Sequence, residues 1–221
     1  MAEQTTTRTR TPPAVLGYRR SPGHHLTSVM DRASGPAVRL REVPFLTQIT
    51  IRAASLEAVA AVSGALGVAL PSRVGEVARG ERGQGHDTEG HDGATGSAIW
   101  LSPDEWLAVL GDEAVTGVSG SAVVASLTAA LGERRGQIVD VSSNRTTLEL
   151  SGSKARAVLD KTIELDLHPR EFPVGRAVST QLESVAVICW RTTADTWLLL
   201  PRASFTEHVV GWLADGMREF A

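Results

Sequence analysis

The sequence predicts an α+β fold built from two similar halves. Alternating apolar and polar residues indicate short strands, and apolar residues at helical spacing indicate helices. The order of these elements is repeated about 98 residues further along the chain. Of the 221 residues, 42% are hydrophobic and 21% are charged, which is typical of a folded protein. No apolar run approaches the ~18 residues of a membrane span, and no signal peptide is expected at the start.

Residues 1–42 are expected to form an extended N-terminal arm. Pro12-Pro13, Ser21-Pro22-Gly23 and Gly35-Pro36 interrupt any helix there. The segment carries seven arginines and three acidic residues, so it is basic while the rest of the chain is acidic. Two interpretations remain open: a disordered tail, or a segment that a partner protein orders through the arginines and a few apolar anchors.

The first repeat is predicted over residues 46–131, within a domain of residues 43–221. Ser55 is placed to cap a helix and Gly67 to end it. A glycine-rich loop is expected over residues 75–97, which hold seven glycines in 23 positions. The predicted regular elements are a strand at 47–52, a helix at 55–67, strands at 98–101 and 105–110, and a helix at 119–131.

The second repeat is predicted over residues 147–220. Ser153 and Pro169 follow Ser55 and Pro71 at the same offset of 98 residues. Two ferredoxin-like units are therefore expected, each with helices on one face of an antiparallel sheet, and packed against each other to complete their cores. The predicted elements are strands at 137–141 and 146–150, a helix from 153, strands at 185–191 and 196–200, and a helix at 203–220.

The glycine-rich loop contains a group of potential metal ligands. Its glycines leave nothing to preorganise a site, and the sequence shows no supporting hydrogen-bond partners. A metal site and a mobile, solvated loop are both compatible with this composition. The candidate ligands are His86, Asp87, Glu89, His91 and Asp92.

Three further residues are of types that can take part in catalysis. Asp140 is a carboxylate in an apolar stretch, where it either caps a turn or has a functional role. His168 is expected at a helix end or on the surface, and Cys189 in an apolar run as an inert core thiol. The sequence lacks nucleotide-binding, nucleophile-elbow and zinc-protease signatures. We therefore assign no catalytic, cofactor-binding or metal-binding residue to this chain.

Charge and cysteine content limit the possible partners and compartment. The chain has 22 basic and 25 acidic residues, a net charge of -3, which argues against nucleic-acid binding. One cysteine cannot form an internal disulfide, which fits the reducing cytoplasm.

Four tryptophans on predicted strands are expected in the core or at an interface: Trp100, Trp106, Trp190 and Trp197.

Four spaced blocks of the sequence are distinctive: Val38-Arg-Leu-Arg-Glu-Val-Pro-Phe-Leu-Thr-Gln48, Trp100-Leu-Ser-Pro-Asp-Glu-Trp-Leu107, Val139-Asp-Val-Ser-Ser-Asn-Arg-Thr146 and Leu165-Asp-Leu-His-Pro-Arg-Glu-Phe-Pro173. Together they resemble the gamma subunit family of heterotetrameric sarcosine oxidase. The resemblance extends from about Arg20 to the C-terminus. It implies an oxidoreductase complex that demethylates sarcosine to glycine, producing hydrogen peroxide and formaldehyde or 5,10-methylenetetrahydrofolate.

The resemblance also implies partners and cofactors. The partners would be the alpha, beta and delta subunits, with FAD, FMN, NAD, zinc and tetrahydrofolate handled by those subunits. The gamma subunit would hold no cofactor and would resemble the N-terminal part of aminomethyltransferase, the glycine cleavage T-protein. Residues Asp140-Val141-Ser142 and Leu150-Ser-Gly-Ser153 look like that family's Asp-Val-Ser and Leu-x-Gly blocks.

The sequence departs from the T-protein pattern at one position. The acidic residue that the T-protein family uses in folate chemistry falls near Val187-Ile188, where this chain is apolar. Two function classes are therefore compared: a non-catalytic subunit of sarcosine oxidase, and a stand-alone folate-binding aminomethyltransferase-like protein. The missing carboxylate favours the first.

Overall fold

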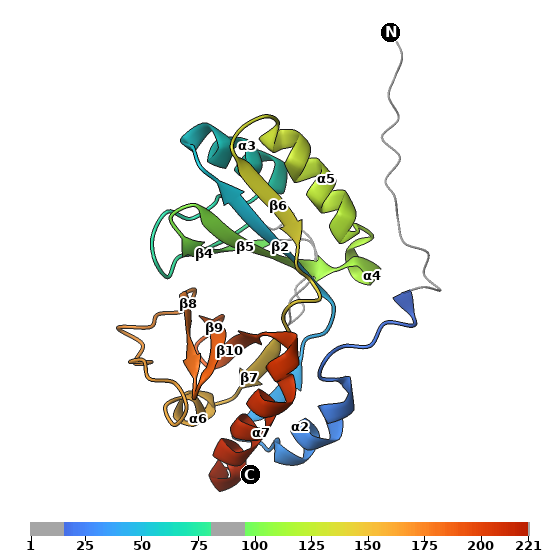
Figure 1. Ribbon diagram of the computed structural model, residues 1–221. Coiled ribbons are helices and arrows are strands. Elements are labelled where there is room, and N and C mark those ends of the chain that lie inside the picture. Colours follow the sequence, from blue (N-terminus) through green and yellow to red (C-terminus); the bar gives the residue numbers. More distant parts are fainter. Residues whose placement is uncertain (1–15, 81–95, 221) are drawn as a thin grey trace.

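The computed structural model describes residues 16–80 and 96–220. These residues form two five-stranded antiparallel sheets, each covered on its outer face by helices (Figure 1). None of the helices in the described ranges is both long and apolar enough to cross a bilayer.

The elements of the first sheet and its helices come from residues 46–140. The strands are β2 (Leu46–Ala53), β3 (Val77–Arg79), β4 (Ser97–Ser102), β5 (Glu105–Asp112) and β6 (Gly136–Asp140). The helices are α3 (Leu56–Leu66), α4 (Glu113–Thr116) and α5 (Gly120–Leu131).

The second sheet combines the second half of the chain with one strand from the N-terminal segment. The strands are β1 (Arg39–Glu42), β7 (Leu148–Ser151), β8 (Ala177–Leu182), β9 (Val185–Arg191) and β10 (Thr196–Pro201). The α-helices are α2 (Thr27–Ala33), α6 (Ala155–Leu159) and α7 (Thr206–Met217), and the short 3-10 helices are η1 (His24–Leu26), η2 (Ala203–Phe205) and η3 (Arg218–Phe220).

Capping residues explain where the longer helices of the first unit begin. Ser55 accepts a hydrogen bond from the Ala58 amide at 3.2 Å, and Ser119 accepts one from the Ala122 amide at 3.2 Å. Each serine satisfies one of the free amides at a helix start. The predicted helices at 55–67 and 119–131 are thus confirmed with nearly the same limits.

The strand order is β3-β4-β5-β2-β6 in the first sheet and β8-β9-β10-β7-β1 in the second. Both halves thus have the same strand order, and the ferredoxin-like repeat is confirmed at the level of topology. In the first unit, β2, β4, β5 and β6 occupy the order 2-3-1-4 of a βαββαβ motif. In the second unit, β7, β9 and β10 take the first three places, and β1 takes the fourth. The second unit is therefore completed by a strand that precedes the first unit in the sequence.

The expectation of an extended, poorly packed arm is wrong for residues 24–42. This segment forms η1, α2 and β1, and β1 pairs with β7 along its whole length. Its apolar side chains enter the core of the second unit: Leu26, Met30, Val38 and Leu40 are each at most 7% exposed. The physical reason is that β7 would otherwise have an unpaired edge and an incomplete apolar face. Residues 1–15 lie outside the described residues.

Three predicted boundaries also change. The first unit extends beyond residue 131 to include β6, and the second includes β1 from before residue 147. Within the predicted loop at 75–97, Val77–Arg79 forms strand β3 and pairs with β4. The five candidate metal ligands at 86–92 lie outside the described residues.

Three apolar cores make the fold a four-layer stack of helices, sheet, sheet and helices (Figure 1). One core lies between the first sheet and α3 and α5, and another between the second sheet and α2, α6 and α7. The third joins the two sheets directly. Its buried members are Leu46, Ile99, Leu107, Val109, Ala177, Ile188, Trp190, Leu198 and Leu200.

Candidate functional site

Asp140 caps a turn at the end of β6. Its carboxylate accepts hydrogen bonds from the backbone amide of Ser142 at 2.9 Å and from the Ser142 hydroxyl. The residue is exposed. The turn-capping interpretation of Asp140 is therefore confirmed, and the carboxylate is already engaged within its own loop.

His168 and Cys189 also have structural roles. His168 is exposed in a turn, where its Nδ1 accepts a hydrogen bond from the Arg170 amide at 3.3 Å. Cys189 is completely buried on β9, and burial raises the pKa of its thiol to about 12. The predicted core position of Cys189 is confirmed, and a thiol with such a raised pKa stays protonated at neutral pH.

The four tryptophans pack in the core as predicted. Trp106, Trp190 and Trp197 are at most 3% exposed, and Trp100 is half-buried against the helices of the first unit. The Trp106 indole donates to the Pro71 carbonyl at 2.7 Å.

In the part of the chain that the structure describes, no group of three or more His, Cys, Asp or Glu side chains could hold a metal ion.

The two repeats are connected by matched crossover segments, residues 43–45 and 141–147. The Val43 amide donates to the Thr147 carbonyl at 2.8 Å, and the Val141 amide donates to the Gln48 carbonyl at 2.8 Å. The first bond joins the two crossovers to each other, and the second ties residues 141–147 to β2, so the two units are fixed relative to each other at this point.

A cavity of about 450 Å³, the crossover cavity, lies against these segments. Its wall comes from three segments: residues 19–22, residues 42–46 with Gln48, and residues 142, 143 and 145–147. The size is that of a small-ligand site. Arg145 and Gln48 are among the polar residues that line it, and Phe45 is among the apolar ones.

Residues 19–23 are fixed at both ends where they border the crossover cavity. Arg19 makes a two-pronged ion pair with Asp112, at 2.9 and 3.1 Å, and lies 4.2 Å above the ring of Phe45. Ser21 and the Gly23 amide both donate to Glu42. The segment is therefore held by the first sheet at one end and by the second at the other.

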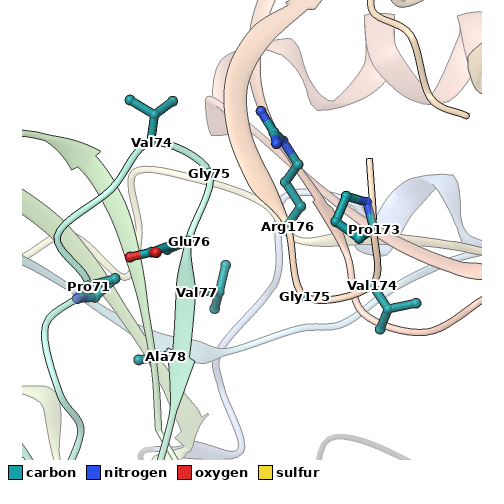
Figure 2. A pocket seen from close by; sticks show the side chains of 10 residues that line it. All are labelled: Pro71, Val74, Gly75, Glu76, Val77, Ala78, Pro173, Val174, Gly175 and Arg176. Carbon is teal, nitrogen blue, oxygen red and sulfur yellow. The ribbon is translucent and has the colours of Figure 1, made fainter. Parts of the chain in front are cut away.

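A second cavity, of about 490 Å³, lies between two similar turns. Figure 2 shows residues 71–78 on one side of this cavity and residues 173–176 on the other. Each turn contains an exposed valine, Val74 or Val174, followed by a glycine with positive φ. The Ala177 amide donates to the Gly75 carbonyl at 3.1 Å and joins the two turns.

Sequence reasoning did not find either cavity. The Val-Gly pairs at 74–75 and 174–175 are separated by 100 residues, close to the repeat offset, and this recurrence was the available signal. The crossover cavity had no comparable signal, because segments 19–22, 42–48 and 142–147 meet only when β1 joins the second sheet.

Comparison with known proteins identifies the family. The model of the sarcosine oxidase gamma subunit family matches residues 51–219. The chain is 45% identical to the sarcosine oxidase subunit gamma of Arthrobacter sp over 205 residues, 92% of each chain. It is 43% identical to the same subunit of Corynebacterium sp. strain P-1 over 205 residues, again 92% of each.

The chain belongs to the sarcosine oxidase gamma subunit family. Among solved structures, this gamma subunit family member matches a chain of the heterotetrameric sarcosine oxidase from Corynebacterium sp. U-96, in complex with pyrrole 2-carboxylate. The two match with a TM-score of 0.78 and 43% identity, over 91% of this chain and 96% of that one.

The fold of this gamma subunit family member also resembles part of a T-protein. It matches the glycine cleavage aminomethyltransferase of Bartonella henselae with a TM-score of 0.57 and 14% identity, over 84% of this chain and 48% of that one. At the position where the T-protein resemblance places an acidic residue, Val187 and Ile188 are 2% and 1% exposed. Val187 packs toward the helices and Ile188 toward the first sheet.

Proposed function

We propose that this chain is the non-catalytic gamma subunit of a heterotetrameric sarcosine oxidase. The enzyme would demethylate sarcosine to glycine, with hydrogen peroxide and formaldehyde or 5,10-methylenetetrahydrofolate as further products. The observation that carries the proposal is the 45% identity, over 92% of both chains, with a protein named as this subunit. The match to a chain of a heterotetrameric sarcosine oxidase supports it.

The geometry of the candidate residues supports a non-catalytic role. Asp140 is engaged by Ser142, and Cys189 is buried with its thiol pKa raised to about 12. At the position where the T-protein resemblance places an acidic residue, this chain instead has the buried apolar residues Val187 and Ile188. These features favour the subunit function over a stand-alone folate-binding aminomethyltransferase.

Partners and cofactors are part of the same proposal. The chain would assemble with alpha, beta and delta subunits in the cytoplasm, and those subunits would hold FAD, FMN, NAD, zinc and tetrahydrofolate. Stable protein–protein contacts commonly bury about 1,200–2,000 Å² in total. A chain of this size has ample surface for such contacts without a catalytic site of its own.

Co-expression with the three partner subunits tests the proposal. A tag on this chain should recover all four chains, flavin absorbance, and sarcosine-dependent hydrogen peroxide production. The isolated full-length chain, purified in the same way, should show neither flavin absorbance nor amine oxidation. Recovery of this chain alone, beside a fully active complex of the other three, would reject the proposed role.

A further inference from the structure

The crossover cavity has an uneven distribution of charge. Arg19 forms an ion pair with Asp112. Glu42 accepts hydrogen bonds from the Ser21 hydroxyl and the Gly23 amide and keeps its negative charge, which offsets only one of the remaining cations. Arg20 and Arg145 also line the cavity. Neither makes an ion pair with a carboxylate of the described residues, so the cavity is left with unbalanced positive charge.

Arg145 is the better placed of these two arginines for binding an anion. It is half-buried, and its Nη1 donates to the Leu200 carbonyl at 3.1 Å. Burial lowers the pKa of its guanidinium and the charge of Arg202 lowers it further, while the charge of Glu105 acts in the opposite direction. A partly desolvated guanidinium gains most from a carboxylate, which it can bind through two parallel hydrogen bonds.

Gln48 provides the second polar feature of the cavity. It is 1% exposed, and its Oε1 has no hydrogen-bond partner in the structure. Its Nε2 makes only long contacts, 3.4 Å to the Arg145 carbonyl and 3.5 Å to the Thr147 hydroxyl. An acceptor buried without a donor is unfavourable, so a ligand that brings an N–H group would be stabilised here.

We propose that the crossover cavity binds a carboxylate that has an N–H donor next to it. Arg145 would be the counter-ion of the carboxylate, and the Gln48 Oε1 would accept from the N–H group. Two sources offer this chemistry: a free amino acid, and an acidic residue within a peptide segment of another protein. The inference concerns this chain alone, so it does not rest on the proposed subunit function.

A titration of the full-length ¹⁵N-labelled chain by NMR tests the proposal. The probes are glycine, for the free amino acid, and the blocked peptide Ac-Gly-Asp-Gly-NH₂, for the peptide source. Ac-Gly-Asn-Gly-NH₂ is the matched neutral control. At least one charged probe should give saturable shifts of the Arg145 and Thr147 amides, and raising the salt concentration should weaken that binding.

Variants connect the binding to the cavity. Arg145→Met should weaken binding of the charged probe at least 10-fold, and Arg145→Lys should weaken it less, because a lysine keeps the charge but not the two-pronged geometry. Gln48→Leu should weaken it several-fold. Arg170→Met removes an arginine from an exposed turn and should leave binding unchanged. Thermal unfolding of each variant checks that it is folded.

The outcomes separate the two sources and can reject the site. Binding of glycine alone supports a free amino acid, and binding of the Asp peptide supports a peptide segment of a partner. If neither charged probe binds, or if Arg145→Met and Arg145→Lys both bind as well as the unchanged chain, the proposal is wrong. Equal binding of the Asn and Asp peptides would also overturn it.

Discussion

Gly75 and Gly175 show at the scale of single residues how the repeat shapes the surface. They occupy the two facing turns of Figure 2, with φ of 82° and 88°. An L-residue in this region costs roughly 1–2 kcal/mol, so glycine is favoured at both positions. The surroundings differ: a Cβ at Gly75 would lie 3.1 Å from the Arg176 Nε, while a Cβ at Gly175 would meet nothing within 4 Å.

This difference predicts unequal effects of the same substitution. Gly175→Ala should lower the free energy of unfolding by about 1 kcal/mol, because the backbone strain is partly offset by a less flexible unfolded chain. Gly75→Ala should lower it by about 2 kcal/mol, since Arg176 must also move. Urea unfolding followed by tryptophan fluorescence measures both. Equal losses would show that the Arg176 contact has no energetic weight.

Cys189 gives a prediction about alkaline stability. Burial raises the pKa of its thiol to about 12, whereas an unfolded thiol ionises near pH ~8.5. The unfolded state therefore loses this proton first, and the stability supported by the neutral thiol is full below pH ~8.5 and declines as pH rises toward 12. The slope from this group is at most about 1.4 kcal/mol per pH unit.

Replacing the thiol tests that slope. Cys189→Ala should lower stability at pH 7 through the lost packing, but should show a shallower decline between pH 9 and pH 10.5 than the unchanged chain. Iodoacetamide should label Cys189 in urea and fail to label it in the native protein. Rapid native labelling would contradict the burial of this side chain.

At the scale of elements, the sequence predicted the helices and strands whose formation depends on residues close together in the chain. The helices at 56–66 and 120–131 have capping serines and apolar spacing, and their limits were found within a residue or two. Strands β1, β3 and β8 were missed. β1 has only Leu40 as a buried side chain within its four residues, and it becomes a strand because β7 offers it an edge. Because Arg41 of β1 and its partner Glu149 of β7 are 108 residues apart in the sequence, their pairing leaves no local pattern.

For the candidate site too, the sequence predicts what depends on nearby residues and misses what depends on distant segments. Turn capping was one of the two roles that the sequence predicted for Asp140. The surface position of His168 and the core position of Cys189 were predicted from their neighbours in sequence. The cavity around Arg145 and Gln48 depends on segments that the tertiary fold brings together, so no spacing of residues announced it.

The role of β1 predicts a strong effect of truncation. Removing residues 1–42 should abolish cooperative unfolding, because it deletes β1, α2 and four buried apolar side chains, at about 1.5 kcal/mol or more for each side chain. That loss is comparable to the whole stability of a typical domain. Removing only residues 1–15 should keep a cooperative transition. Circular dichroism during thermal unfolding distinguishes the two, and a cooperative transition without residues 1–42 would contradict the assignment of β1.

At the scale of the whole molecule, the inter-sheet core joins the repeats into one body. Ile99, Leu107 and Val109 of the first sheet pack against Ile188, Trp190 and Leu198 of the second. The crossover hydrogen bonds of Val43 and Val141 add a second connection. Neither unit can open without exposing this shared apolar surface, so the two sheets are expected to unfold together.

Hydrogen exchange tests this coupling. Leu127→Ala truncates a side chain that is 1% exposed in the core of the first unit only, at a cost of about 2–5 kcal/mol. In a single cooperative body, the slowest amides of β9 and β10 in the second sheet should lose as much protection as those of β2 and β5 in the first. Leu56→Ala, at a leucine that is 88% exposed, is the matched control and should change neither sheet. Loss of protection confined to the first sheet would show that the repeats unfold separately, and that the inter-sheet core does not couple them.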